Sequence, residues 1–152
     1  MGLTKIDICN QALLKVGADM IASLDTSSSS TESHIRSASL CKTFFDSSLE
    51  ETIRVYAFNS CTKRSKPNKL DASPTFEYDN AFVLPNDCIR VIDVYDNENA
   101  YDDRLKYVVE GRNILCDYDT IYLKYAARPD DITHLDPLAA QVVILKLALK
   151  LA

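Results

Sequence analysis

The sequence predicts an α+β fold, in which three helices form a small bundle and a small antiparallel β-sheet is inserted between the second and third helices. Apolar residues recur every three or four positions before residue 60 and again after residue 136. Between about residues 80 and 127 the pattern changes to short alternating runs separated by turn residues. A chain of 152 residues has room for one domain with a real core, and we expect residues 1–152 to form a single domain.

The first helix is expected at about residues 5–16. Thr4 and Asp7 have the spacing of a capping box, although Glu or Gln is the usual partner in that motif. Apolar residues follow at helical spacing, and Gly17 is a natural residue to end the helix.

The second helix is expected at about residues 31–58, after a capping box formed by Ser29 and Glu32. One apolar stripe continues along this segment with no Gly or Pro inside it. At 1.5 Å per residue the helix would be roughly 40 Å long and would serve as the spine of the domain. We expect it to be unbroken and to bury four residues of the stripe, which are Ile35, Phe45, Leu49 and Ile53.

A basic loop is expected at residues 61–74, where the composition changes. Four basic residues fall within seven positions: Lys63, Arg64, Lys66 and Lys69. One interpretation is a solvated surface loop, which is what a run of charges usually forms. The other is that the four residues contact a partner protein or the backbone of DNA in a channel, with weak and salt-sensitive affinity.

The inserted sheet is expected at about residues 80–127, with four or five strands in hairpin order. A short apolar run ends at Pro85, which has no backbone donor, and a turn precedes the strand-like run that begins at Cys88. Residues 105–109 and 121–125 alternate between apolar and polar, and Gly111 suits the turn between strands.

The last helix is expected at residues 137–152, with Asp136 as its cap and Pro137 in its first position. It is so rich in large apolar residues that both of its sides need cover. The first two helices can cover one side, which leaves the other to a neighbouring subunit or to a segment beyond Ala152. The residues proposed for a subunit interface are Leu138, Val142, Leu145 and Leu149.

The composition argues against several classes of function. The net charge of −5 makes a broad DNA-binding face a poor fit. The five cysteines include no CxxC pair, so we expect buried thiols and no disulfide or zinc site. No catalytic motif is present, and His34 and His134 have the character of surface or capping residues. We therefore expect no enzyme activity, no catalytic residues, no metal and no cofactor.

Four blocks of sequence resemble one known family in the same order along the chain. The first is ICNQALLKVGA at residues 8–18 with IASLD at 21–25, and the second is FVLPNDCIRV at 82–91. The third is YVVEGRNIL at 107–115 with IYLKY at 121–125, and the fourth is DPL at 136–138 with the Leu/Ala-rich segment after it. Together they resemble tail tubular protein A, the head-to-tail adaptor of short-tailed bacteriophages. Residues 55–59, VYAFN, depart from the Pro-Trp-Asn-Phe-Ala type of segment that relatives often carry there.

The resemblance implies a structural part of a virion. Such adaptors form a ring, usually of twelve copies, between the portal protein and the tail nozzle protein. The ring extends the channel through which double-stranded DNA passes without sequence specificity. The protein would then be found in the neck or tail of the virion, and in the host cytoplasm during assembly, with no attachment to a membrane.

Two alternatives remain open at the level of sequence. One is a phage head-completion or tail protein with cell-wall hydrolase activity, which would need two carboxylates about 5 to 9 Å apart across a cleft. The other is a regulatory or scaffold domain that acts in the host. A peptidoglycan turbidity assay would test the first, and a size measurement in the presence of portal protein would test the second.

Overall fold

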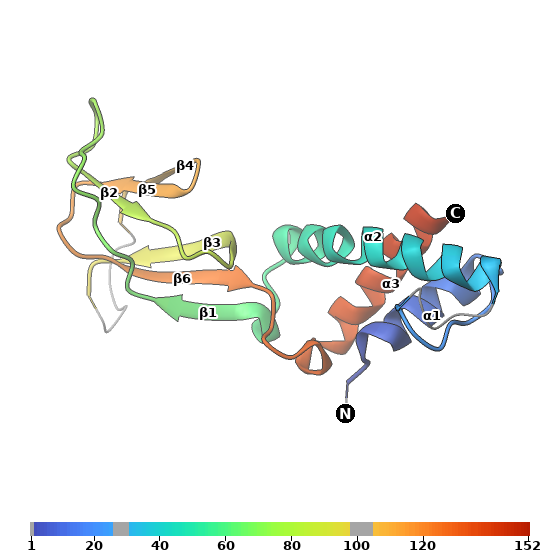
Figure 1. The fold of residues 1–152 in the computed structure, drawn as a ribbon. Coiled ribbons are helices and arrows are strands. Elements are labelled where there is room, and N and C mark those ends of the chain that lie inside the picture. The colour runs from blue at the N-terminus through green and yellow to red at the C-terminus, as the bar shows by residue number, and fades with distance from the viewer. Residues whose placement is uncertain (1, 26–30, 98–104) are drawn as a thin grey trace. The chain divides into compact units, whose positions relative to one another are not determined.

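The structure is a computed structural model that describes residues 2–25, 31–97 and 105–152. Within these ranges it contains three α-helices and two three-stranded antiparallel sheets, which confirms the α+β class (Figure 1).

The chain divides into two compact units. Residues 1–61 and 128–152 form a helical unit, and residues 62–127 form a sheet unit. The sheets are therefore inserted between the second and third helices, as the sequence predicts. The assignment of residues 1–152 to a single domain stays a prediction.

The first helix, α1, spans Lys5–Lys15, within one residue of the predicted range. The predicted capping box forms: the Thr4 hydroxyl accepts a hydrogen bond from the Asp7 N–H, and the Asp7 carboxylate accepts one from the Thr4 N–H. Gly17 takes a positive φ of 77° and ends the helix, which is the conformation that glycine adopts at little cost.

The second helix, α2, spans Glu32–Val55 in 24 residues without a break. The predicted end at residue 58 is wrong by three residues, because Tyr56 is extended and its ring packs edge to face with that of Phe58, 4.8 Å away. The proposed cap residue Ser29 lies outside the described residues. A short 3-10 helix at Asn59–Cys61 follows and leads into the sheet unit.

The burial predicted for α2 is confirmed at three positions and wrong at one. Phe45, Leu49 and Ile53 are buried, but Ile35 is 38% exposed. The buried residues of α2 run from Ala38 to Ile53, so Ile35 lies in a first turn that extends beyond the packed part of the helix.

The third helix, α3, spans Pro137–Leu151 after a short 3-10 helix at Ile132–His134. The Asp136 side chain accepts hydrogen bonds from the N–H groups of the first turn, as the sequence predicts. The helix packs against both α1 and α2. Its buried face mixes small and large residues: Ala139, Ala140, Val143, Ile144, Leu147 and Ala148.

The sheet unit contains two sheets, where the sequence predicts one. The first has the strand order β1 (Thr62–Ser65), β6 (Tyr122–Ala127), β3 (Cys88–Tyr95). The second has the order β2 (Asn80–Val83), β5 (Asn113–Cys116), β4 (Val108–Glu110).

The predicted basic loop at residues 61–74 is also corrected, because its first residues form β1. This strand pairs with β6 and so adds an edge to the sheet that alternation alone does not reveal. Charged side chains are common on an edge strand, where they discourage pairing with other chains.

The two sheets of this unit pack face to face around one apolar core. Phe82 and Ile114 enter it from the second sheet, and Val94 and Leu123 enter it from the first. Since side chains alternate between the faces of a strand, the neighbours of these residues point outward from the sandwich.

Arg112 connects two of the sequence blocks that carry the family resemblance. Its guanidinium donates hydrogen bonds to the carbonyl oxygens of Pro85 and Cys88, at 2.5 and 2.9 Å. The Leu84 N–H in turn donates to the Arg112 carbonyl oxygen. The turn at Pro85 is therefore held by the turn that contains Gly111.

Candidate interaction surfaces

An exposed apolar stripe runs along α3. Leu138, Leu145 and Leu149 are 66%, 56% and 79% exposed, and Val142 is partly buried. Steps of four, three and four residues place all four on one side of a helix. The structure thus brings together the residues that the sequence proposes as a subunit interface, and their contact with another subunit stays a prediction.

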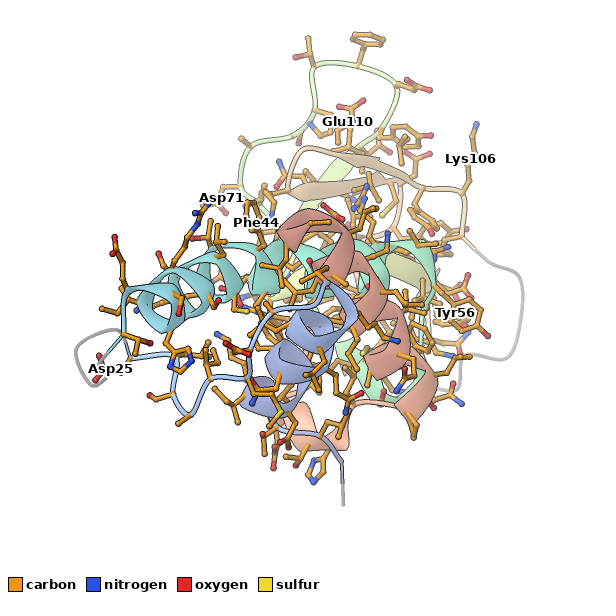
Figure 2. The ribbon with its side chains drawn as sticks, turned by 90° about the vertical axis from the view of Figure 1, so that its right-hand side faces the viewer. Asp25, Phe44, Tyr56, Asp71, Lys106 and Glu110 are labelled. Carbon is orange, nitrogen blue, oxygen red and sulfur yellow. The ribbon has the colours of Figure 1, made fainter. Side chains whose placement is uncertain are left out.

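The stripe continues into a hollow of about 340 Å³ beside the end of α2. Leu138 and Val142 line this hollow together with Tyr56 and Phe58. Tyr56 is 63% exposed, and Figure 2 shows its side chain pointing away from the ribbon. We refer to Tyr56 and the four stripe residues together as the α3 patch. Sequence reasoning missed Tyr56, because its spacing continues the apolar stripe of the expected second helix.

Two of the predicted contact residues are held in ion pairs within the sheet unit. The Lys63 ammonium lies 3.0 Å from the Asp87 carboxylate, which also accepts a hydrogen bond from the Tyr125 hydroxyl at 3.0 Å. Partial burial acts to raise the pKa of Asp87, but the hydrogen bonds from Lys63 and Tyr125 outweigh it, so the pKa lies below its usual value. Lys69 pairs with Asp119 at 3.2 Å.

The other two predicted residues belong to a different surface. Lys66 lies over the Tyr122 ring, 5.5 Å from its centroid, and Arg64 is directly opposite Lys124 in the pairing of β1 with β6. The four basic residues of the predicted loop are therefore not one cluster. Their association with a partner or a channel stays a prediction.

The outward face of the first sheet gathers basic residues from three strands. Arg64 comes from β1, Lys124 from β6 and Arg90 from β3, and Lys66 follows the end of β1. Asp93 of β3 is directly opposite Lys124, on the side away from β1, and adds an acidic group to this face. We call these four basic residues the basic face. The alternation of β6 could have revealed Lys124, but no local signal pairs it with Arg64.

The side chains that could bind a metal ion or act as nucleophiles do not form a cluster in the described parts of the chain. In the parts of the chain that the structure describes, no three His, Cys, Asp or Glu side chains are grouped so that they could hold a metal ion. The five cysteines are free and buried. Burial raises the pKa of Cys61 and of Cys116, and a hydrogen bond with Cys41 together with burial raises that of Cys9. Thiols with raised pKa values are poor nucleophiles.

The two histidines also lie apart from any such group. His134 is exposed, 3.9 Å from Asp131 within a short 3-10 helix. His34 lies in the first turn of α2.

Of the helices in the described ranges, none combines the length and the apolar character needed to cross a membrane.

Comparison of the chain with protein-family models and with curated proteins gives no match. The family resemblance therefore rests on the four sequence blocks alone.

Proposed function

We propose that this protein is a structural subunit of a phage virion, a head-to-tail adaptor that forms a ring between the portal protein and the tail nozzle. The observation that carries the proposal is the α3 patch, an apolar surface whose four α3 residues are those that the sequence assigns to a subunit contact. The resemblance of the four sequence blocks supplies the kind of assembly. The order of helix, long helix, inserted sheets and helix is consistent with it.

The proposed occupant of the α3 patch is a neighbouring copy of the chain. Burying one leucine is worth roughly 1.5–3 kcal/mol, so three exposed leucines and a tyrosine offer enough free energy to matter in assembly. A pairwise contact must still offset the lost freedom of two molecules. For this reason we expect the isolated chain to be a monomer and the ring to form on the portal, which holds many copies in place.

The experiment is to mix the full-length protein with the purified portal protein of the same phage and to follow sedimentation. We expect the chain to co-sediment with the portal in a fixed ratio of many copies per portal. Replacing Leu145 and Leu149 by Glu should prevent this. The absence of any association of the wild-type protein at micromolar concentration would contradict the proposal.

The alternative of a cell-wall hydrolase has one observation in its favour. Glu77 and Glu110 line the same hollow in the sheet unit, as a pair of carboxylates in a glycosidase would. Both side chains are exposed, however, whereas the acid of such a pair acts from an apolar pocket. Clearing of a peptidoglycan suspension by the wild type, and not by Glu110→Gln, would favour the hydrolase.

A further inference from the structure

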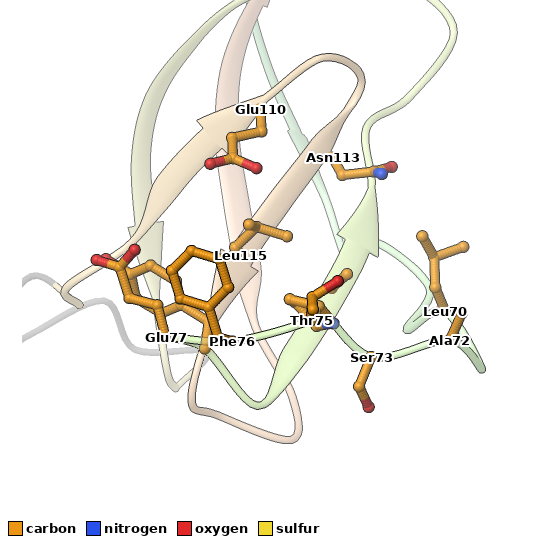
Figure 3. Close-up of a pocket in the computed structure, with 12 residues that line it drawn as sticks. Leu70, Ala72, Ser73, Thr75, Phe76, Glu77, Glu110, Asn113 and Leu115 are labelled. Atoms are coloured by element: carbon orange, nitrogen blue, oxygen red, sulfur yellow. The ribbon is translucent and has the colours of Figure 1, made fainter.

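The outward face of the second sheet carries a hollow of about 400 Å³. Leu115 of β5 and Tyr78 contribute to a small apolar cluster beneath it, and the segment at residues 72–78 forms its wall. Figure 3 shows Phe76 and Glu77 at one end of the hollow and Leu70 at the other end. Leu115 lies in the middle.

The charge of this hollow is negative. Among the described residues that line it, the charged ones are Glu77 and Glu110, and both are exposed. Phe76 is 79% exposed beside them. Two carboxylates next to an exposed ring form a site that suits an ammonium or a guanidinium group, which can pair with the carboxylates and stack on the ring. We call this site the acidic hollow.

The backbone of the acidic hollow is held in an unfavourable conformation. Glu77 has a φ of 78°, and within the described ranges it is the non-glycine residue with positive φ. A side chain with a Cβ adopts this region at a cost in free energy, and such outliers often occur at binding sites. Glu77, which has this conformation, stands between the exposed Phe76 and the buried Tyr78 in the sequence.

The basic face has an unfavourable feature of its own. Arg64 and Lys124 are directly opposite each other on neighbouring strands, and like charges in that position destabilise a sheet. Asp93, which is opposite Lys124 on β3, offsets part of this repulsion, and carboxylates of a bound partner would relieve it further. Lys66 and Arg64 are both exposed, so their charged groups are accessible to such a partner.

The two sites lie on opposite sides of one sandwich. The basic face is the outward side of the sheet β1–β6–β3, and the acidic hollow is on the outward side of the sheet β2–β5–β4, while their inner sides share one core. Two complementary sites on opposite sides of a subunit cannot satisfy each other within that subunit. Between copies they produce a head-to-tail contact, which closes into a ring when the rotation per subunit is suitable.

We propose that the sheet units of neighbouring copies bind head to tail, with the basic face of one copy in contact with the acidic hollow of the next. Lys66 and Lys124 are the amines, and Glu77 and Glu110 the carboxylates, that this contact brings together. The inference rests on the proposed ring, and it assigns the second set of contacts around that ring to the sheet units. Charge complementarity between these sites would also set the direction in which subunits follow one another.

The test uses two charge-reversed variants of the full chain. The first carries Glu77→Lys and Glu110→Lys, and the second carries Arg64→Glu and Lys124→Glu. When either variant is alone, the two sites that meet carry charges of the same sign, so we expect the affinity between its copies to weaken by about tenfold or more. An equimolar mixture of the two should recover wild-type association, because each variant then offers the site that the other needs.

The measurement is zero-length carbodiimide coupling of amines to carboxylates, which traps brief contacts between chains that are monomeric at equilibrium, in a concentrated equal mixture of ¹⁵N-labelled and unlabelled chains at low salt. Mass spectrometry should find Lys66 or Lys124 joined to Glu77 or Glu110 between labelled and unlabelled chains. High salt should suppress these cross-links. Matched controls reverse two exposed charges of the helical unit, Asp19→Lys with Glu50→Lys or Lys15→Glu with Lys42→Glu, and should leave the cross-links unchanged.

Four outcomes would overturn the inference. The first is the absence of these cross-links between chains, and the second is a mixture of variants that associates no better than either alone. The third is binding of duplex DNA that the Arg64→Glu, Lys124→Glu variant abolishes while no cross-link forms, which would assign the basic face to nucleic acid. If both variants still form a ring on the portal, this inference fails and the proposed function stands. If the cross-links form but the wild type does not bind the portal, the proposed function fails and the contact between sheet units stands.

Discussion

The exposed surface of the helical unit differs in chemistry from those of the sheet unit. The helical unit displays leucines along α3, and the sheet unit displays charged residues on one side and an acidic hollow on the other. Apolar contacts supply free energy without strong direction, whereas charged contacts select orientation and partner. The difference suggests a division of roles, in which α3 supplies the affinity between subunits and the sheet unit supplies the order in which they join.

This difference can be traced to local sequence. The helix α3 has fifteen residues, and one of its faces is buried against α1 and α2. Leu138, Leu145 and Leu149 lie on the opposite, exposed side of the helix. In the sheet unit, alternation places outward side chains between inward ones. In β6, for example, Lys124 lies between the buried Leu123 and Tyr125.

The largest effect on stability is expected from truncation in the buried part of the helical unit. Phe45→Ala should lower the free energy of unfolding by about 3–5 kcal/mol, because Phe45 is 2% exposed in the core. Leu149→Ala is the control, since Leu149 is 79% exposed and should change stability by no more than about 0.5 kcal/mol. Urea denaturation measures both. Equal losses for the two variants would show that the α3 stripe is packed within the chain and would remove the basis of the comparison.

A smaller effect on stability but a complete effect on assembly is expected from the α3 patch. Leu145→Glu combined with Leu149→Glu should leave the unfolding free energy of the isolated chain within about 1 kcal/mol of wild type, because both residues are exposed. It should prevent co-sedimentation with the portal, because the contact would have to bury two carboxylates.

The matched control for that variant adds the same charge elsewhere on the helical unit. Ser33→Glu with Ser39→Glu places two carboxylates at exposed positions of α2. We expect this control to co-sediment with the portal as wild type does. If it is equally defective, added negative charge alone explains the loss and the α3 patch is not the contact.

The smallest effect is expected from the ion pair between Lys63 and Asp87. The pKa of Asp87 is below its usual value of 3.8 in the folded chain, so the carboxylate contributes stability at neutral pH. That contribution is lost as the pH falls below about 4 and passes the lowered pKa. The pair is partly exposed, so Asp87→Asn should lower stability at pH 7 by less than about 1 kcal/mol.

The check is the difference in unfolding free energy between wild type and Asp87→Asn across the acidic range. We expect the two proteins to converge as the pH falls. Asp71→Asn, which removes an exposed carboxylate of the same unit, controls for the loss of one charge. A difference that stays constant with pH would show that Asp87 acts through packing instead of through its charge.

Local patterns were sufficient to predict the helices. The capping residues Thr4 and Asp136 act as expected, because a cap depends on residues within one turn of the helix. The predicted end of α2 is too late because Tyr56 continues the apolar spacing although its backbone is already extended. The prediction that Ile35 is buried is wrong because the apolar stripe indicates which side of the helix faces the core, but not the length over which neighbouring helices cover it.

The sheet unit shows where sequence patterns are insufficient. The assignment of residues 62–65 to a loop was wrong because their pairing partner, β6, lies about sixty residues away in the sequence. The same distance hides the basic face, which combines Arg64 with Lys124. The four stripe residues of the α3 patch can be predicted because they lie on a single helix, where spacing alone determines which side chains share a face. Tyr56 cannot be predicted in this way, because it follows a different helix.

The central claim, that the protein is a ring-forming adaptor, is tested most directly by electron microscopy of the full-length chain mixed with the purified portal protein. The account predicts a ring of copies stacked coaxially on the portal, with α3 at the contact between neighbouring copies. It further predicts that the variant with Leu145→Glu and Leu149→Glu leaves the portal bare. Portals without an added ring in the wild-type sample, together with clearing of peptidoglycan by the free protein, would contradict the account.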